Sequence, residues 1–165
     1  MRLVDTGSTE KRLIILGVGN MLYRDEGLGV YIVRKLRGYH FTGNVTLIEA
    51  GTETIDAFLD AADTDRVIVI DAVQAGGVPG SIYRVNLGDI SGQHGSSRTS
   101  LHEISLVDSY NMARILLPEI PEVIVIAVEL ESVEPGLGLS PSIRNKVDKI
   151  VDAVLLEVNN YLGRC

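Results

Sequence analysis

The chain has 165 residues and a hydrophobic fraction of 45%, which suits one domain with a hydrophobic core. Its net charge of −7 argues against a nucleic-acid partner, because phosphate binding requires a basic surface. No apolar run approaches the length of a membrane-spanning helix, and the N-terminal residues do not follow the pattern of a secretory signal. We therefore expect a cytoplasmic domain over residues 12–165 with no membrane partner, preceded by a polar N-terminal extension over residues 1–11.

The first half of the chain is predicted to alternate between strands and helices. Residues 13–18 form a continuous apolar run, which is typical of a strand covered on both faces. After a glycine-rich turn, apolar residues recur at helical spacing over residues 28–36. The pattern then predicts a strand at residues 45–49, a short helix at 55–59 and a buried strand at 66–72.

The second half adds an edge strand, a helix and a last buried strand. Residues 81–86 alternate in polarity and follow a Pro-Gly turn. The connection is too short for a helical crossover, so this strand should run antiparallel to the strand before it. Residues 88–100 are rich in Gly and Ser and are predicted to form a loop. A helix at residues 104–117 and a buried strand at 122–128 follow.

The C-terminal segment is predicted to be one helix, with Ser140 as its cap and Pro141 in its first turn. One face is apolar and should be buried: Ile143, Val147, Ile150, Val154 and Val158. The opposite face should meet water: Arg144, Lys149, Asp152 and Glu157. Together the elements predict an α/β domain with a mostly parallel sheet of about five strands, one antiparallel edge strand, and helices on both faces.

Three residues are candidate metal ligands. Asp71 ends a strand of valines and isoleucines, where a carboxylate is costly unless it is solvated, paired or bound to a cation. Glu26 follows the first strand, so the same sheet edge should present both acids. His102 follows the Gly/Ser-rich loop, which could fold over that edge. Each alone has an ordinary structural explanation, but two carboxylates and one imidazole suit a divalent first-row metal with open coordination positions.

The sequence carries part of a dinucleotide-binding pattern and lacks the common motifs of serine hydrolases and zinc proteases. Gly17 and Gly19 begin a G-x-G-x-x-G pattern, but Leu22 occupies its last glycine position and an acidic pair follows, which would repel a pyrophosphate. Glu49 could take the part of a ribose-binding acid, so a nucleotide-binding Rossmann-like module stays open as an alternative. No G-x-S-x-G elbow or H-E-x-x-H helix occurs, and Cys165, the one cysteine, is the last residue.

Several motifs resemble, in order, those of the hydrogenase maturation endopeptidases. Residues 13–30, LIILGVGNMLYRDEGLGV, are similar to the opening signature of that family. The further matches are Ala50-Gly51-Thr52, the strand-end Asp71, Pro79-Gly80, Ser100-Leu101-His102 and the stretch Glu131-Ser132-Val133-Glu134-Pro135. An ordered series of motifs is far more specific than any one of them.

The resemblance implies a three-layer sandwich on a twisted sheet, with Glu26, Asp71 and His102 as metal-binding and catalytic residues. It implies a metal-assisted or aspartic endopeptidase without a Ser or Cys nucleophile. Such an enzyme removes the C-terminal extension from the large-subunit precursor of a nickel–iron hydrogenase after nickel insertion. Nickel would come with the precursor, and no tightly bound organic cofactor is expected. A non-catalytic chaperone that checks the precursor for nickel is the remaining alternative.

Overall fold

The computed structural model describes residues 10–90 and 101–163, so residues 91–100 of the predicted loop and most of the N-terminal extension lie outside the described residues. The elements in the first half of the chain are β1 (Arg12–Val18), the 3₁₀ helix η1 (Arg24–Gly27), α1 (Leu28–Leu36), β2 (Asn44–Gly51), α2 (Thr54–Asp60) and β3 (Arg66–Val73). Those in the second half are β4 (Ile82–Asn86), α3 (Leu87–Ile90), α4 (Leu101–Leu116), β5 (Glu122–Glu129), α5 (Pro141–Arg144) and α6 (Val147–Leu162).

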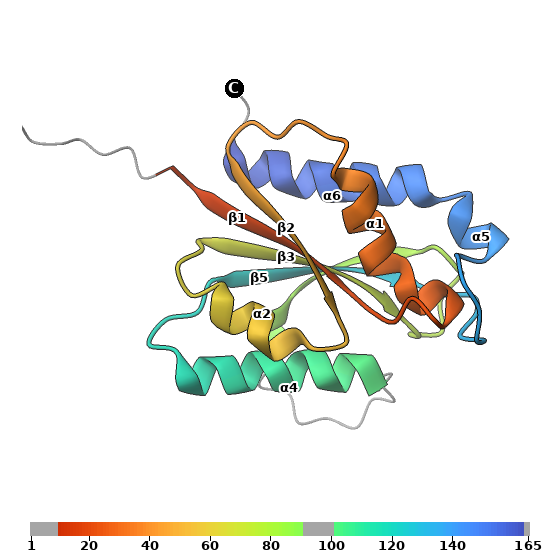
Figure 1. Ribbon diagram of the computed structural model, residues 1–165, viewed down its shortest axis with the longest axis horizontal. Coiled ribbons are helices and arrows are strands. Elements are labelled where there is room, and N and C mark those ends of the chain that lie inside the picture. The colour runs from red at the N-terminus through yellow and green to blue at the C-terminus, as the bar shows by residue number, and fades with distance from the viewer. Residues whose placement is uncertain (1–9, 91–100, 164–165) are drawn as a thin grey trace, which may run out of the picture.

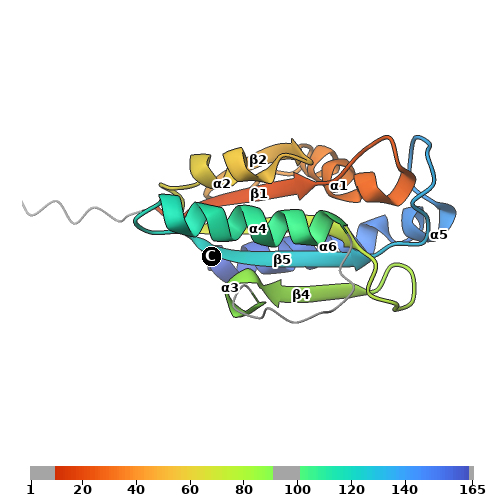
Figure 2. The same cartoon turned by 90° about the horizontal axis from the view of Figure 1, so that it is seen from below.

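The five strands form one sheet in the order β2-β1-β3-β5-β4. Neighbouring strands are parallel except for β4, which runs antiparallel to β5 at one edge (Figure 2). The prediction of a mostly parallel sheet with one antiparallel edge strand is therefore confirmed. The edge strand pairs with β5 rather than with β3, because β5 lies between them and pairs with β3 along its whole length.

Helices cover both faces of the sheet, which confirms the three-layer architecture. The helices α1 and α6 lie on one face, and α2 and α4 lie on the other (Figure 1). Alternate residues of a strand serve the two cores: Leu13 and Ile15 pack toward α1 and α6, whereas Ile14 and Leu16 pack toward α2 and α4. This division explains why β1, β3 and β5 are continuous apolar runs. Within the described residues, no helix is long and apolar enough to cross a membrane.

The C-terminal segment differs from its prediction at its start. It forms two helices, α5 and α6, instead of one continuous helix. Ser140 precedes α5, but its side chain makes no capping hydrogen bond. The Ser140 hydroxyl instead donates to the Asp25 carboxylate at 2.8 Å, so a contact distant in sequence outcompetes the local cap.

The prediction that Glu157 faces water is wrong. The apolar face of the C-terminal segment is buried as expected, but Glu157 is also buried, at 6% exposure. Its carboxylate accepts hydrogen bonds from Arg84 Nε at 2.7 Å and from Arg84 Nη2 at 2.9 Å. Arg84 lies on β4, so this pair ties the edge strand to α6. A helical pattern alone assigned the acid to water because it could not anticipate an arginine partner 73 residues away.

Two differences concern the region around the predicted loop. The short helix α3 occupies residues 87–90, at the start of the segment predicted to be a loop. The helix α4 begins at Leu101, three residues before its predicted start, so His102 lies in its first turn. These shifts matter for the site, because α4 packs over the same face of the sheet as Asp71.

Candidate functional site

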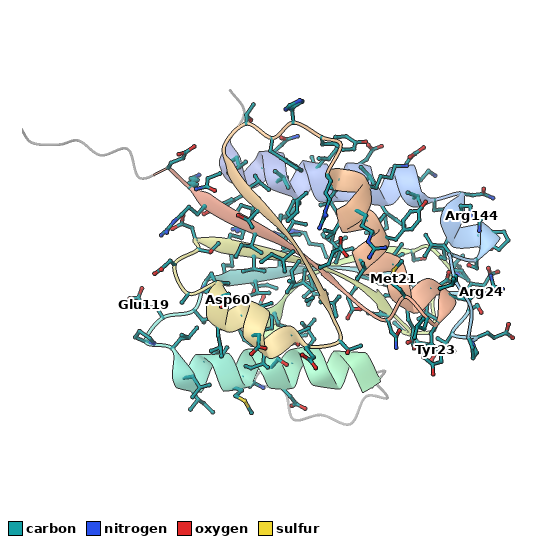
Figure 3. The ribbon with its side chains drawn as sticks, in the orientation of Figure 1. Met21, Tyr23, Arg24, Asp60, Glu119 and Arg144 are labelled. Carbon is teal, nitrogen blue, oxygen red and sulfur yellow. The ribbon has the colours of Figure 1, made fainter. Side chains whose placement is uncertain are left out.

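The candidate site lies at the carboxyl end of the parallel strands, where functional groups of open α/β sheets collect. At this end the turn after β1, η1 and α5 come together (Figure 1). Figure 3 shows Met21, Tyr23, Arg24 and Arg144 there, far from Asp60 and Glu119 at the opposite end.

Glycines bring the Glu26 turn close to the strand ends. Gly19 has φ 134, a conformation that L side chains rarely adopt, and a Cβ there would clash with the Glu26 carbonyl oxygen. A Cβ at Gly29 would clash with the carbonyl oxygens of Val18 and Ile70, so α1 starts against both β1 and β3. As a result, η1 packs on β3, and Glu26 lies at the same carboxyl end of the strands as Asp71.

Asp25, the acid before Glu26, has a structural role that the sequence interpretation did not find. It is fully buried, at 0% exposure. Its Oδ2 accepts from the backbone N–H groups of Glu131 and Ser132 at 3.0 and 2.9 Å. Ser140 donates to Oδ1 from its backbone N–H at 2.7 Å and to Oδ2 from its hydroxyl at 2.8 Å. Four hydrogen bonds to one carboxylate therefore anchor residues 131–140 to η1.

Backbone hydrogen bonds strengthen the same junction. Arg24 N–H donates to the Gly136 carbonyl at 2.9 Å, and Gly136 N–H donates to the Leu22 carbonyl at 2.8 Å. Among the described residues, Arg24 is the only non-glycine residue with positive φ, at 41°. Such a conformation persists only where the surrounding contacts enforce it. The turn that carries Glu26 is therefore held rigidly from both sides.

Asp71 lies in β3, two residues before the strand ends, in agreement with the predicted strand-end position. It is 2% exposed, and its Oδ1 accepts from the backbone N–H of Ala72 at 2.8 Å. Its side chain lines a partly open pocket of about 150 Å³, and the other described residues in the lining are all aliphatic. The carboxylate thus borders an apolar pocket beneath α4.

The convergence of Glu26, Asp71 and His102 stays a prediction. Glu26 is half-buried in η1, and Asp71 is buried at the end of the adjacent β3. His102 is placed as the second residue of α4, but its side chain lies outside what the structure describes. Among the described side chains, no three His, Cys, Asp or Glu residues form a metal-binding group. Leu106, one helical turn beyond His102, lines the Asp71 pocket, so α4 approaches this acid.

A larger open pocket of about 420 Å³ lies between the turn after β1 and the end of β2. Glu49 lines it and is engaged by two cations, Arg34 at 3.0 Å and Arg37 at 2.8 Å. The hydrogen bond from Arg34 lowers the pKa of Glu49, against the opposing effect of partial burial. Because Arg34 is in α1 and Arg37 directly follows its last residue, this carboxylate stabilises the junction between α1 and β2.

The turn after β1 offers little for a pyrophosphate. Gly19 N–H donates to the Gly51 carbonyl at 2.8 Å, and Leu22 N–H donates to the Asn20 side chain at 3.0 Å. Glu26 N–H donates to the Tyr23 carbonyl at 3.0 Å. A phosphate-binding turn presents such N–H groups to the ligand, whereas here they are used within the fold. This geometry gives the nucleotide-binding alternative no support.

Glu129 is a second buried acid that the sequence interpretation missed. It ends β5 at 2% exposure and accepts hydrogen bonds from the backbone N–H groups of Ala75 and Gly76 at 3.0 Å. The Tyr83 hydroxyl also donates to it, at 3.2 Å. Glu129 therefore fixes the turn between β3 and β4. The signal that identified Asp71, an acid at the end of an apolar strand, was present here too.

Comparison with known proteins agrees with this fold. The family model described as hydrogenase maturation protease matches residues 30–157. The hydrogenase expression/formation protein HupD of Bradyrhizobium diazoefficiens is 31% identical over 150 residues, which cover 89% of this chain and 78% of that protein. The hydrogenase 2 maturation protease of Escherichia coli is 29% identical over 146 residues, covering 87% and 88% of the two chains.

A solved structure shares the same architecture. The hydrogenase maturating endopeptidase HybD of E. coli superposes with a TM-score of 0.79 at 28% sequence identity. The superposition covers 91% of this chain and 93% of that one. The similarity therefore extends over nearly the whole fold.

Proposed function

This chain belongs to the hydrogenase maturation protease family, and on that premise we propose that it is a metal-dependent endopeptidase acting on a nickel–iron hydrogenase large-subunit precursor. It removes the C-terminal extension of that precursor after nickel has been inserted. The observation that carries this proposal is the position of Asp71, a buried carboxylate beside an apolar pocket at the carboxyl end of the parallel strands. Glu26 is brought to the same edge by η1.

The reaction is hydrolysis of one peptide bond. A water molecule adds its oxygen to the scissile carbonyl carbon while a carboxylate accepts one of its protons. The carbon–nitrogen bond then breaks, and that proton passes to the leaving nitrogen. Asp71 or Glu26 is the general base in this scheme, because each is an acid at the sheet edge and no Ser or Cys nucleophile motif occurs in the sequence.

Nickel enters this scheme as part of the substrate. Glu26, Asp71 and His102 provide two carboxylates and one imidazole, which hold a first-row metal less strongly than a site containing thiolates. The cysteines of the precursor provide the softer ligands, so the ion is shared between the two proteins. A precursor without nickel lacks this contact, and the difference in binding supplies the selection for loaded precursor. The shared ion also polarises the scissile carbonyl or the attacking water.

The test is release of the C-terminal extension. We expect the full chain, mixed with nickel-loaded precursor, to release one peptide that mass spectrometry identifies as the intact extension. Glu26→Gln should lower the rate about 100-fold or more if Glu26 holds the metal or the water. Glu119→Gln, an acid at the opposite end of the molecule, is the matched control and should cleave normally (Figure 3). A stable complex without any release would replace the protease by a nickel-checking chaperone.

A further inference from the structure

Resting on the endopeptidase function proposed above, we propose that the pocket beside Asp71 is a specificity pocket. It takes up an apolar side chain of the precursor from a residue next to the scissile bond.

Among the residues that the structure describes, the lining of the pocket is apolar except at Asp71. Its other eight lining residues are aliphatic and come from β3, β4, α3, α4 and β5. Leu106, Val125 and Ala127 are nearly fully buried, whereas Ile90 is 40% exposed and marks the side open to solvent. A charged or amide side chain entering this pocket would lose its hydration without finding partners on the aliphatic walls. The lining therefore favours an aliphatic or thioether side chain.

The size of the pocket fits one medium side chain. Its volume is about 150 Å³. An apolar cavity of about this size in a protein interior accepts a benzene molecule, so a leucine or methionine side chain fits and alanine leaves space. Removing a methylene or more from a side chain in such a pocket typically lowers kcat/KM by about 10–200-fold.

The position of the pocket fixes which substrate residue it receives. Asp71 is itself part of the lining, and Ala127 is its register partner on the neighbouring strand β5. A side chain in the pocket therefore lies against both residues. Because successive residues of an extended peptide are only about 3.3 Å apart, this side chain belongs to a residue directly flanking the bond that is cut.

The experiment measures kcat/KM for nickel-loaded precursors in which each residue flanking the scissile bond is replaced in turn by Leu, Ala or Asp. With the wild-type chain, one flanking position should prefer Leu over Ala by about 10-fold or more, and Asp there should be cleaved worst. Ala127→Leu fills the pocket beside Asp71 and should reverse this order, so that Ala is preferred at the same position. Val107→Phe narrows the pocket from α4 and should produce the same reversal.

Ala153→Leu adds the same bulk to α6 on the opposite face of the sheet and should keep the wild-type preference. If the wild-type chain cleaves the precursors with less than about threefold preference at both flanking positions, the pocket has no such role, and the endopeptidase assignment stands. The same conclusion follows if the folded Ala127→Leu and Val107→Phe variants keep the wild-type preference. If the wild-type chain releases no extension from any precursor, the proposed function itself is wrong, and the pocket assignment falls with it.

Discussion

Asp25 and Asp71 are both buried acids at the carboxyl end of the parallel strands, but their surroundings differ. Asp25 accepts four hydrogen bonds from Glu131, Ser132 and Ser140, which join two segments more than 100 residues apart in sequence. The Asp71 carboxylate accepts a hydrogen bond from the adjacent Ala72 and borders an apolar pocket. The two side chains have similarly low exposure, so the acids are distinguished by the groups that surround their carboxylates and not by burial.

The difference indicates that Asp25 stabilises the fold and is the basis for proposing that Asp71 acts on the substrate. A carboxylate surrounded by donors of its own chain stabilises the conformation that provides those donors. A carboxylate on the wall of a pocket is placed to contact a ligand that enters the pocket. We therefore expect substitutions at Asp25 to lower stability and substitutions at Asp71 to lower cleavage.

The largest expected effect is on cleavage by Asp71→Asn. The amide keeps an oxygen for the Ala72 N–H but removes the negative charge that we propose binds the metal or accepts a proton. We expect the rate of extension release to fall about 100-fold to 10,000-fold, with the free energy of unfolding within about 1 kcal/mol of wild type. Rates and urea melts should be compared with Asp60→Asn, an acid at the opposite end of the molecule (Figure 3). A strongly destabilised Asp71→Asn would make Asp71 a structural acid like Asp25.

The next effect is on stability and concerns Asp25. In Asp25→Ala the four donors lose a buried, charged acceptor, and hydrogen bonds to charged groups each contribute about 1.5–3 kcal/mol. We expect unfolding to become easier by about 3 kcal/mol or more, which lowers the urea midpoint by roughly 1–2 M. Asp25→Asn keeps one acceptor oxygen, so its urea midpoint should lie between those of the wild-type chain and Asp25→Ala. An unchanged midpoint would contradict the anchoring role.

Glu157, in α6, is another buried acid whose partners belong to the same chain. The hydrogen bonds from Arg84 lower the pKa of Glu157, although burial opposes this shift. Because its folded pKa lies below the unfolded value of about 4.3, its contribution is present above that value and is lost as pH falls through the folded pKa. Glu157→Gln should cost about 1–2 kcal/mol at pH 7 and should flatten the decline in stability in acid. Urea melts between pH 7 and pH 3 measure both, and parallel wild-type and variant curves would contradict the account.

The smallest effect is expected at Glu49, whose partners Arg34 and Arg37 have side chains that are 55% and 58% exposed. Ion pairs with exposed partners contribute little to stability because water and salt screen them. Glu49→Gln should leave the urea midpoint and the cleavage rate close to those of wild type. A large loss of cleavage with normal stability would mean that the larger pocket beside Glu49 also receives the precursor.

Much of the fold could be predicted because the strands are strongly patterned. Continuous apolar runs marked β1, β3 and β5, and the short Pro-Gly connection marked β4 as antiparallel. The break between α5 and α6 was missed, because helical periodicity and Pro141 gave no sign that Ser140 bonds to Asp25, 115 residues earlier. Local patterns cannot reveal such distant partners.

The site was predictable in part for the same reason. Asp71 was singled out because an acid is unexpected at the end of a buried strand, and the structure places it there. The adjacent acids Asp25 and Glu26 could not be assigned different roles from sequence. Which of them turns inward depends on donors in residues 131–140. The pocket beside Asp71 was also not predictable, since it is formed by five separate elements.

The most direct test of the account is the rate at which the purified chain cuts nickel-free and nickel-loaded precursor. The account predicts that the chain carries no tightly bound metal of its own and cleaves only the loaded precursor. The proposed ligands Glu26, Asp71 and His102 include no thiolate, so we expect them to bind nickel weakly without the cysteines of the substrate. Free nickel added to the chain alone should not replace nickel placed in the precursor. Equal cleavage of both precursors would contradict the shared-metal mechanism and would assign water activation to the acids alone.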